Sequence, residues 1–144
     1  MIYTMKALVY EKPWKMTLQD LPKPKPAAGE VVIEMESVGI CGSDVHGFTG
    51  ESGRRTSGMV MGHEVVGRVV ELADDVTDRT IGQRVTVFNV LSDEAPSHEE
   101  GDPSFLNKRV VGVNLGTRGA MAEFLALPAR NAIPVSEDIP PEVS

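Results

Sequence analysis

The residues best suited to chemistry lie in two short stretches of the first half of the chain. The first is Gly39-Ile-Cys-Gly-Ser-Asp-Val-His46 and the second is Gly62-His-Glu-Val-Val-Gly67. Thiolate and imidazole are natural zinc ligands, and a catalytic zinc site uses three protein ligands while leaving one position open. Cys41 and His63 are therefore candidate zinc ligands, and Glu64 is a candidate for an oxygen ligand or for a place just outside the metal's ligands.

Each of these residues taken alone also has an ordinary structural explanation. A cysteine that follows a strand is usually a small buried hydrophobe. A histidine such as His63 is often held by hydrogen bonds in a core, and Glu64 could be a solvated charge. Ser43 and Asp44 are residue types that cap short helices. The spacing by itself leaves both the metal site and these structural roles open.

Composition narrows the class of protein. The 144 residues carry a net charge of −7, which argues against duplex nucleic acid as a partner because phosphates need a cationic face. The single cysteine excludes an internal disulfide and a zinc site built from several cysteines of one chain. No apolar run approaches a membrane span and the N-terminus lacks a signal-peptide core, so we expect a cytoplasmic protein without a membrane partner.

Hydrophobic alternation predicts short β-strands with little helix. In the clearest strand, Val31, Ile33 and Met35 share one face, whereas Glu34 and Glu36 point to the other. No segment has a helical period over ten residues, so the pattern predicts a closed or sandwich-like all-β architecture. The strands are expected at Met5–Tyr10, Trp14–Leu21, Glu30–Ile40, Val65–Leu72, Arg84–Val90, Val110–Val113, Met121–Leu127 and Ala132–Val135.

Three other stretches differ from this pattern. Gly42–Gly62 is polar and rich in glycine, which predicts a loop or short helical turn that carries function. Ser92–Lys108 is acidic and rich in turn residues, and we expect a surface excursion there. Gly67 lies inside a predicted strand, where a glycine indicates a bulge or a close backbone approach.

The two chemical stretches together resemble the two signatures of the zinc-containing medium-chain alcohol and polyol dehydrogenases. Other segments resemble this family in the same order along the chain: Met5–Val9, Pro26–Ile33, Gly82–Val87 and Gly119–Pro128. The resemblance implies a mainly β fold over residues 1–144, a GroES-like, partly open β-barrel with short helical turns that forms the catalytic domain.

The resemblance also implies a role for each site residue. Cys41 and His63 would ligate one catalytic zinc, and Glu64 would lie beside the metal and exchange with water as a ligand. Asp44 would accept a hydrogen bond that orients a ligand. Ser43 would hydrogen-bond the substrate hydroxyl or a metal-bound water, and His46 would pass the proton toward solvent.

The implied activity is oxidation of a small secondary alcohol, a polyol, a sugar or a threonine-like molecule, with NAD or NADP as hydride acceptor. Gly42 stands where some relatives carry a basic residue that contacts cofactor phosphate, which favours the polyol, sugar and threonine enzymes. Ser92–Lys108 lacks the four cysteines that hold a structural zinc in many relatives, so we expect no such metal. His98 and its acidic neighbours are expected to form a solvated loop.

The sequence has no G-x-G-x-x-G phosphate loop, since Gly116-Thr-Arg-Gly119 lacks that spacing and its strand-turn-helix context. We therefore expect an N-terminal fragment of a longer, homo-oligomeric dehydrogenase, without the dinucleotide-binding Rossmann domain. Ser136–Ser144 resembles the first turn of a helix, and the family's third zinc ligand would follow Ser144. The fragment alone is expected to be inactive and to bind zinc weakly or not at all.

Two alternatives remain open at this stage. The first is a non-enzymatic GroES-like binding or assembly module, which the joint presence of Cys41, His63 and Glu64 disfavours. The second is a zinc-free relative of the quinone reductases, which lack the Cys/His pair.

Overall fold

The computed structural model describes residues 2–92, 109–114 and 118–143, which form a mainly β fold. Three sheets have the strand orders β2-β1-β4, β10-β6-β5-β3-β9 and β7-β8. Within the described residues there is one α-helix, α1, and a short 3-10 turn, η2. The elements are β1 Thr4–Lys12, β2 Lys15–Pro22, β3 Glu30–Gly39, α1 Gly42–Thr49, β4 Met59–Val60, β5 Glu64–Leu72, β6 Arg84–Val87, β7 Val90–Leu91, β8 Arg109–Val110, β9 Phe124–Pro128, η2 Ala129–Asn131 and β10 Ala132–Pro134.

The five-stranded sheet forms a half-barrel around the main hydrophobic core, as the resemblance implies. Its strand β3 lies between β5 and β9 and is antiparallel to both. Val31 and Ile33 are fully buried in this core, as their alternation predicts, but Val32 between them is buried as well. At Gly67 a Cβ atom would collide with the carbonyl oxygen of Glu34, so the predicted close backbone approach is confirmed.

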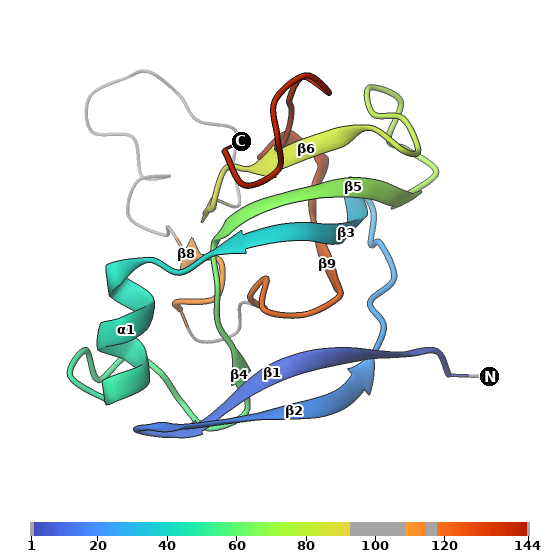
Figure 1. The fold of residues 1–144 in the computed structure, drawn as a ribbon. Helices are drawn as coiled ribbons and strands as arrows, with labels where there is room; N and C mark the ends of the chain where they lie inside the picture. The colour runs from blue at the N-terminus through green and yellow to red at the C-terminus, as the bar shows by residue number, and fades with distance from the viewer. Residues whose placement is uncertain (1, 93–108, 115–117, 144) are drawn as a thin grey trace, which may run out of the picture.

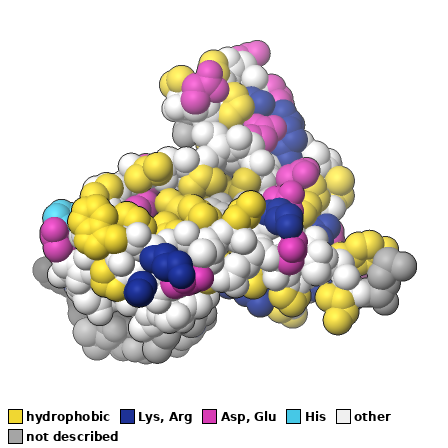
Figure 2. Space-filling model, turned by 60° about the horizontal axis from the view of Figure 1, so that its bottom comes forward, with side chains coloured by type: hydrophobic (Ala, Val, Ile, Leu, Met, Phe, Trp, Pro, Cys, Tyr) yellow, Lys and Arg dark blue, Asp and Glu magenta, His cyan; other side chains and the backbone are white. Residues whose placement is uncertain are grey.

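The three-stranded sheet lies at the opposite side of the molecule (Figure 1). Ala7, Val9 and Val60 form a second, smaller core on it. The face that carries β1 and β2 also exposes apolar side chains, with Trp14 and Leu18 exposed by 72% and 67%. Figure 2 shows hydrophobic atoms gathered on this face.

Helix α1 stands at the end of the molecule where the chain leaves β3, between the two larger sheets (Figure 1). The tip of the β1–β2 hairpin holds it there. The backbone N–H of Trp14 donates to the backbone carbonyl of Phe48 at 2.9 Å. The Trp14 and Phe48 rings meet edge to face with centroids 5.6 Å apart. The helix ends at Gly50, whose positive φ of 87° suits glycine and where a Cβ would collide with Pro13.

The predicted strands are confirmed with several changes at their ends. The expected strand Arg84–Val90 is interrupted, because β6 ends at Val87 and β7 begins at Val90. The expected strand Val110–Val113 was wrong beyond Val110, because the chain turns at Gly112 with a φ of +65°. The prediction missed β4, which is only two residues long.

The expected strand Met121–Leu127 begins later, at Phe124, although Ala122 makes an isolated bridge to Ala7. The described part of Ser136–Ser144, the stretch that resembles the first turn of a helix, forms turns. Residues 93–108 lie outside the described residues, and the predicted acidic excursion falls there. None of the helices in the described part of the chain is both long and apolar enough to cross a membrane.

Candidate metal centre

The candidate metal centre lies where the turn between β3 and α1 meets the segment that leads into β5. Cys41 is the N-cap residue of α1, Glu64 is the first residue of β5, and His63 directly precedes it. Antiparallel pairing of β3 with β5 sets Gly39 opposite Glu64, which brings the two stretches together. One ligand atom each from Cys41, His63 and Glu64 lies within 4.8 Å of the other two.

Gly39 makes room for this arrangement. A Cβ atom at Gly39 would lie 2.5 Å from Oε2 of Glu64 and 3.0 Å from its Cβ. A larger residue would displace the Glu64 carboxylate from its present position. The glycine two residues before the cysteine therefore leaves room for the Glu64 side chain across the strand pair.

The three candidate ligands differ in burial. His63 is 6% exposed, Cys41 is half-buried and Glu64 is exposed. His63 and Glu64 also line a hollow of about 370 Å³ together with Thr86, Asn89 and other residues. The candidate ligands thus range from a buried histidine to an exposed carboxylate beside a hollow. A catalytic metal site likewise keeps one coordination position open for a small molecule.

The His63 ring lies between two polar side chains of α1. Ser43 Oγ is 3.4 Å from Nε2, and Asp44 Oδ1 is 3.5 Å from Nδ1. The other carboxylate oxygen of Asp44 accepts the backbone N–H of Cys41 at 3.0 Å. Asp44 therefore takes part in capping the helix, the structural role that its residue type allows, and it also faces the His63 ring.

Two polar atoms at this contact have no hydrogen-bond partner among the described residues. They are Asp44 Oδ1 and His63 Nδ1, both fully buried. Buried polar atoms are normally satisfied, and an unsatisfied pair this close calls for an explanation. A metal on the other ring nitrogen would make Nδ1–H a stronger donor toward Asp44, the arrangement common in metal-binding histidines.

No sequence pattern indicates Arg55 as a site residue. Its side chain is 2% exposed, and Nη2 lies 3.7 Å from Asp44 Oδ1. Its guanidinium donates to the carbonyls of Ser43 and Val113, each at 3.3 Å. Burial lowers the pKa of Arg55, and the Asp44 carboxylate opposes that shift. The adjacent Arg54 is exposed, so the pattern offered no signal that one of the two arginines is buried.

His46 does not belong to the group of candidate ligands. Its ring is exposed, and Nδ1 lies 2.8 Å from a carboxylate oxygen of Glu51. His46 and Ser43 both line a second hollow of about 430 Å³ beside α1. Ser43 thus touches His63 on one side and shares a hollow with His46 on the other.

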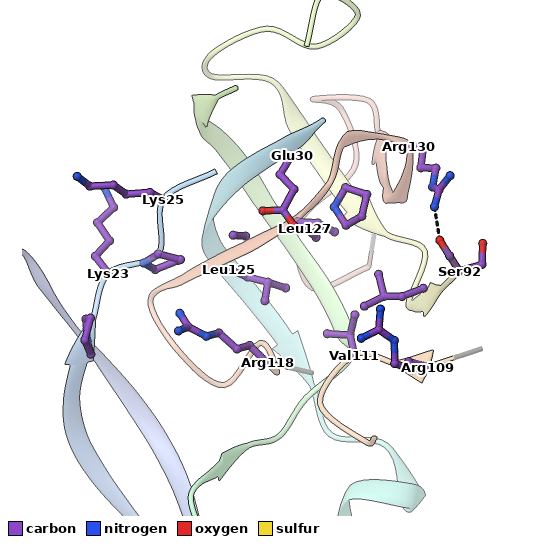
Figure 3. A pocket seen from close by; sticks show the side chains of 15 residues that line it. Lys23, Lys25, Glu30, Ser92, Arg109, Val111, Arg118, Leu125, Leu127 and Arg130 are labelled. Carbon is purple, nitrogen blue, oxygen red and sulfur yellow. Dashed lines mark hydrogen bonds between the residues drawn. The ribbon is translucent and has the colours of Figure 1, made fainter. Parts of the chain in front are cut away.

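A larger hollow, of about 720 Å³, is lined by neither Cys41 nor His63. It has a basic lining instead (Figure 3). Of the lining residues, Lys23 is paired with Glu71 at 2.8 Å, and Arg130 donates to the carbonyl of Ser92. The five cations around it are Lys23, Lys25, Arg109, Arg118 and Arg130. Its lining includes no residue of the candidate metal centre.

Comparison with known proteins points to one family. The model of the alcohol dehydrogenase GroES-like domain matches residues 27–137. An L-threonine 3-dehydrogenase of Xanthomonas campestris pv. campestris is 35% identical over 97% of this chain. The chain spans 42% of that relative's length.

Solved structures agree with this result. An alcohol dehydrogenase from Escherichia coli CFT073, complexed with NADH, superposes with a TM-score of 0.81 at 29% identity, covering 96% of this chain and 40% of that one. A dehydrogenase from Sinorhizobium meliloti 1021 bound to NADP gives a TM-score of 0.81 at 26% identity, with the same coverage of 96% and 40%.

Proposed function

Because the chain belongs to the family of alcohol dehydrogenase GroES-like domains, we propose that it is the metal-holding catalytic domain of a zinc-dependent, NAD(P)-linked dehydrogenase. The substrate would be a small secondary alcohol. The observation that carries this proposal is the meeting of Cys41, His63 and Glu64, whose ligand atoms all lie within 4.8 Å of one another.

These three residues fit zinc by their chemistry. A thiolate, an imidazole and a carboxylate are all ligands that zinc accepts. The half-buried Cys41 and the buried His63 would hold the metal, and the exposed Glu64 would be the ligand most easily exchanged for water. When bound, zinc supplies Lewis acidity that lowers the pKa of an alcohol toward neutrality.

The remaining residues would handle the substrate and its proton. Ser43 Oγ, 3.4 Å from the His63 ring, is placed to hydrogen-bond the substrate hydroxyl. His46 lines the same hollow as Ser43 and is exposed, so it could accept the proton and release it to solvent. An imidazole titrates near neutral pH, which suits a proton relay.

The cofactor and substrate class follow from the relatives. Solved relatives carry NADH and NADP, and we propose a nicotinamide cofactor for this protein as well. The curated relative acts on the 3-position of L-threonine by its name, which supports a secondary alcohol beside polar groups. The chain has no glycine-rich phosphate loop, so we expect no dehydrogenase activity from these 144 residues alone.

Metal titration of the purified chain tests the proposal. Cobalt titration should give one weak site per chain, with visible bands and a thiolate charge-transfer band, because the family's third ligand is not among these residues. A chromophoric chelator in competition gives the zinc affinity. We expect the metal to be removable by EDTA, because one of the three ligands is exposed.

The variant Cys41→Ser should lose the thiolate band and lower zinc affinity by more than the ~10–100-fold typical of residues that support a ligand. The matched control is His46→Gln, a histidine of the same helix that is not among the three donors and should leave zinc affinity unchanged. If Cys41→Ser binds zinc as tightly as the unaltered chain, the proposal is wrong, and a zinc-free reductase or a binding module takes its place.

A further inference from the structure

We propose that Arg55 is a positioning residue of the metal centre, which sets the Asp44 carboxylate against His63 so that the metal-facing nitrogen of His63 is the unprotonated one. The inference rests on the proposed function and deepens it. Arg55 lies between a polar loop and β4, and its polar contacts are with Asp44 and with two backbone carbonyls rather than with the three candidate ligands.

The first step is the way Arg55 is held. Its side chain is 2% exposed and makes two hydrogen bonds to backbone carbonyls, one in α1 at Ser43 and one at Val113. These two bonds tie the helix to the segment 109–114. A planar guanidinium with several donors suits this bridging role better than a flexible ammonium does.

The second step is the close contact between the Arg55 side chain and the backbone of α1 at Gly47. A Cβ atom at Gly47 would lie 2.7 Å from Arg55 Nε and 2.9 Å from its Cγ and Cζ. The guanidinium therefore lies directly against the helix backbone at the one glycine in the middle of α1. By contrast, a Cβ at Gly42 in the same helix would meet nothing within 4 Å.

The third step concerns charge. Asp44 is 2% exposed, and an unpaired carboxylate in such a place is costly. Arg55 is the cation paired with it, at 3.7 Å from Oδ1, and the same oxygen lies 3.5 Å from His63 Nδ1. A buried carboxylate without an ionic partner is costly, so without Arg55 the Asp44 side chain would turn away from His63 toward solvent or another donor.

The fourth step links this pair to the histidine tautomer. In a neutral imidazole one nitrogen donates and the other accepts. A carboxylate held opposite Nδ1 favours the proton there, which leaves the lone pair on Nε2 free for a metal. Arg55 thus acts on His63 through Asp44, and the effect should exist before any metal binds.

The test uses the 144-residue chain in two states. In the metal-free chain, ¹⁵N NMR of the His63 ring reports which nitrogen carries the proton. In the metal-loaded chain, competition with a chromophoric chelator reports zinc affinity. The variants are Arg55→Gln, Arg55→Lys and, as matched control, Arg54→Gln, which alters the exposed neighbour.

We expect Arg55→Gln to shift His63 away from the Nδ1–H tautomer and to lower zinc affinity about 10–100-fold. Arg55→Lys, which keeps the charge, should restore part of both signals, and Arg54→Gln should change zinc affinity less than ~2-fold, because Arg54 is exposed. A purely structural role would lower the melting temperature and leave the tautomer unchanged. That result, or an equal effect of Arg54→Gln, would overturn the inference.

If Arg55→Gln does not fold, Arg55→Lys decides the question in a double-mutant cycle with Asp44→Asn. The two changes should be non-additive in zinc affinity, because both act on His63 through one contact. Additive losses would overturn the inference. A chain that binds no metal but shows the Arg55-dependent tautomer contradicts the proposed function alone.

Discussion

Two clusters of arginine and carboxylate groups among the described residues are built in opposite ways. In the buried cluster, Asp44 Oδ1 lies 3.7 Å from Arg55 Nη2 and 3.5 Å from His63 Nδ1, both beyond good hydrogen-bond distance. In the surface cluster, Arg68 donates two hydrogen bonds to Glu137 at 2.8 and 2.7 Å.

The surface cluster is satisfied within the protein. Arg68 and Arg84 both contact Glu36 on β3, and Arg84 also donates to the carbonyls of Glu137 and Ile139. The hydrogen bonds from Arg68 lower the pKa of Glu137, and the two carboxylates raise the pKa of Arg68. This cluster connects the segment around Glu137 to β5 and β6, and its charged groups are paired with one another.

The buried cluster is unsatisfied in the places where a ligand would act. Asp44 Oδ1, His63 Nδ1 and Arg55 Nε have no hydrogen-bond partner among the described residues. Short, complete contacts are typical of a structural cluster, whereas the long, incomplete contacts beside Cys41 and His63 support the proposed metal site. Four predictions test this contrast.

The largest effect is expected from Asp44→Ala. It leaves Arg55 buried without its counter-charge, and removal of one partner of a buried pair costs about 3–5 kcal/mol of the free energy of unfolding. Urea denaturation measures the loss. The matched change in the surface cluster is Glu137→Ala, which should cost clearly less because Glu137 is exposed and solvent screens its pair with Arg68. Equal losses would contradict the contrast between the two clusters.

The next effect compares two glycines of α1. Gly47→Ala should destabilise the chain by about 1–3 kcal/mol, because the new methyl collides with Arg55. Gly42→Ala has open space and should be neutral or gain about 0.5–1 kcal/mol, since alanine favours a helix over glycine. Thermal melting of both variants measures the difference. A Gly47→Ala chain as stable as Gly42→Ala would show that Arg55 does not pack firmly on the helix.

A smaller effect concerns acid stability. The pKa of Glu137 is lowered in the folded chain, so its stabilising contribution is present above its ordinary value of 4.5 and is lost as pH falls through the folded value. Melting temperatures measured between pH 6 and pH 3 should therefore fall less steeply in Glu137→Gln. The difference between the two chains should be small, because Glu137 is exposed. Parallel pH curves would show that the ion pair does not contribute.

The smallest effect is that of salt. The Debye length falls from ~30 Å at 0.01 M to ~3 Å at 1 M ionic strength, which screens exposed pairs more than buried ones. High salt should reduce the effect of Glu137→Gln and leave that of Asp44→Ala nearly unchanged. Denaturation at both ionic strengths checks this. A strong salt dependence of the Asp44→Ala effect would mean that the buried cluster is open to solvent.

Local pattern was sufficient for most of the fold. Alternating apolar residues located β3, because a half-buried strand repeats every two residues. The same rule overextended the strand at Val110, since it does not register the turn at Gly112, which packs against the backbone of Gly62. Strand β4 was missed because two residues are too few to show a period.

The candidate site divides in the same way. The sequence by itself determined the donor types and their family signature, Cys41, His63 and Glu64, and it suggested Asp44 and Ser43 beside them. Only the tertiary structure decided that Gly39 lies opposite Glu64 and that Arg55 is buried against Asp44. The physical reason is that strand register and burial arise from contacts between residues far apart in the chain, which local spacing does not encode.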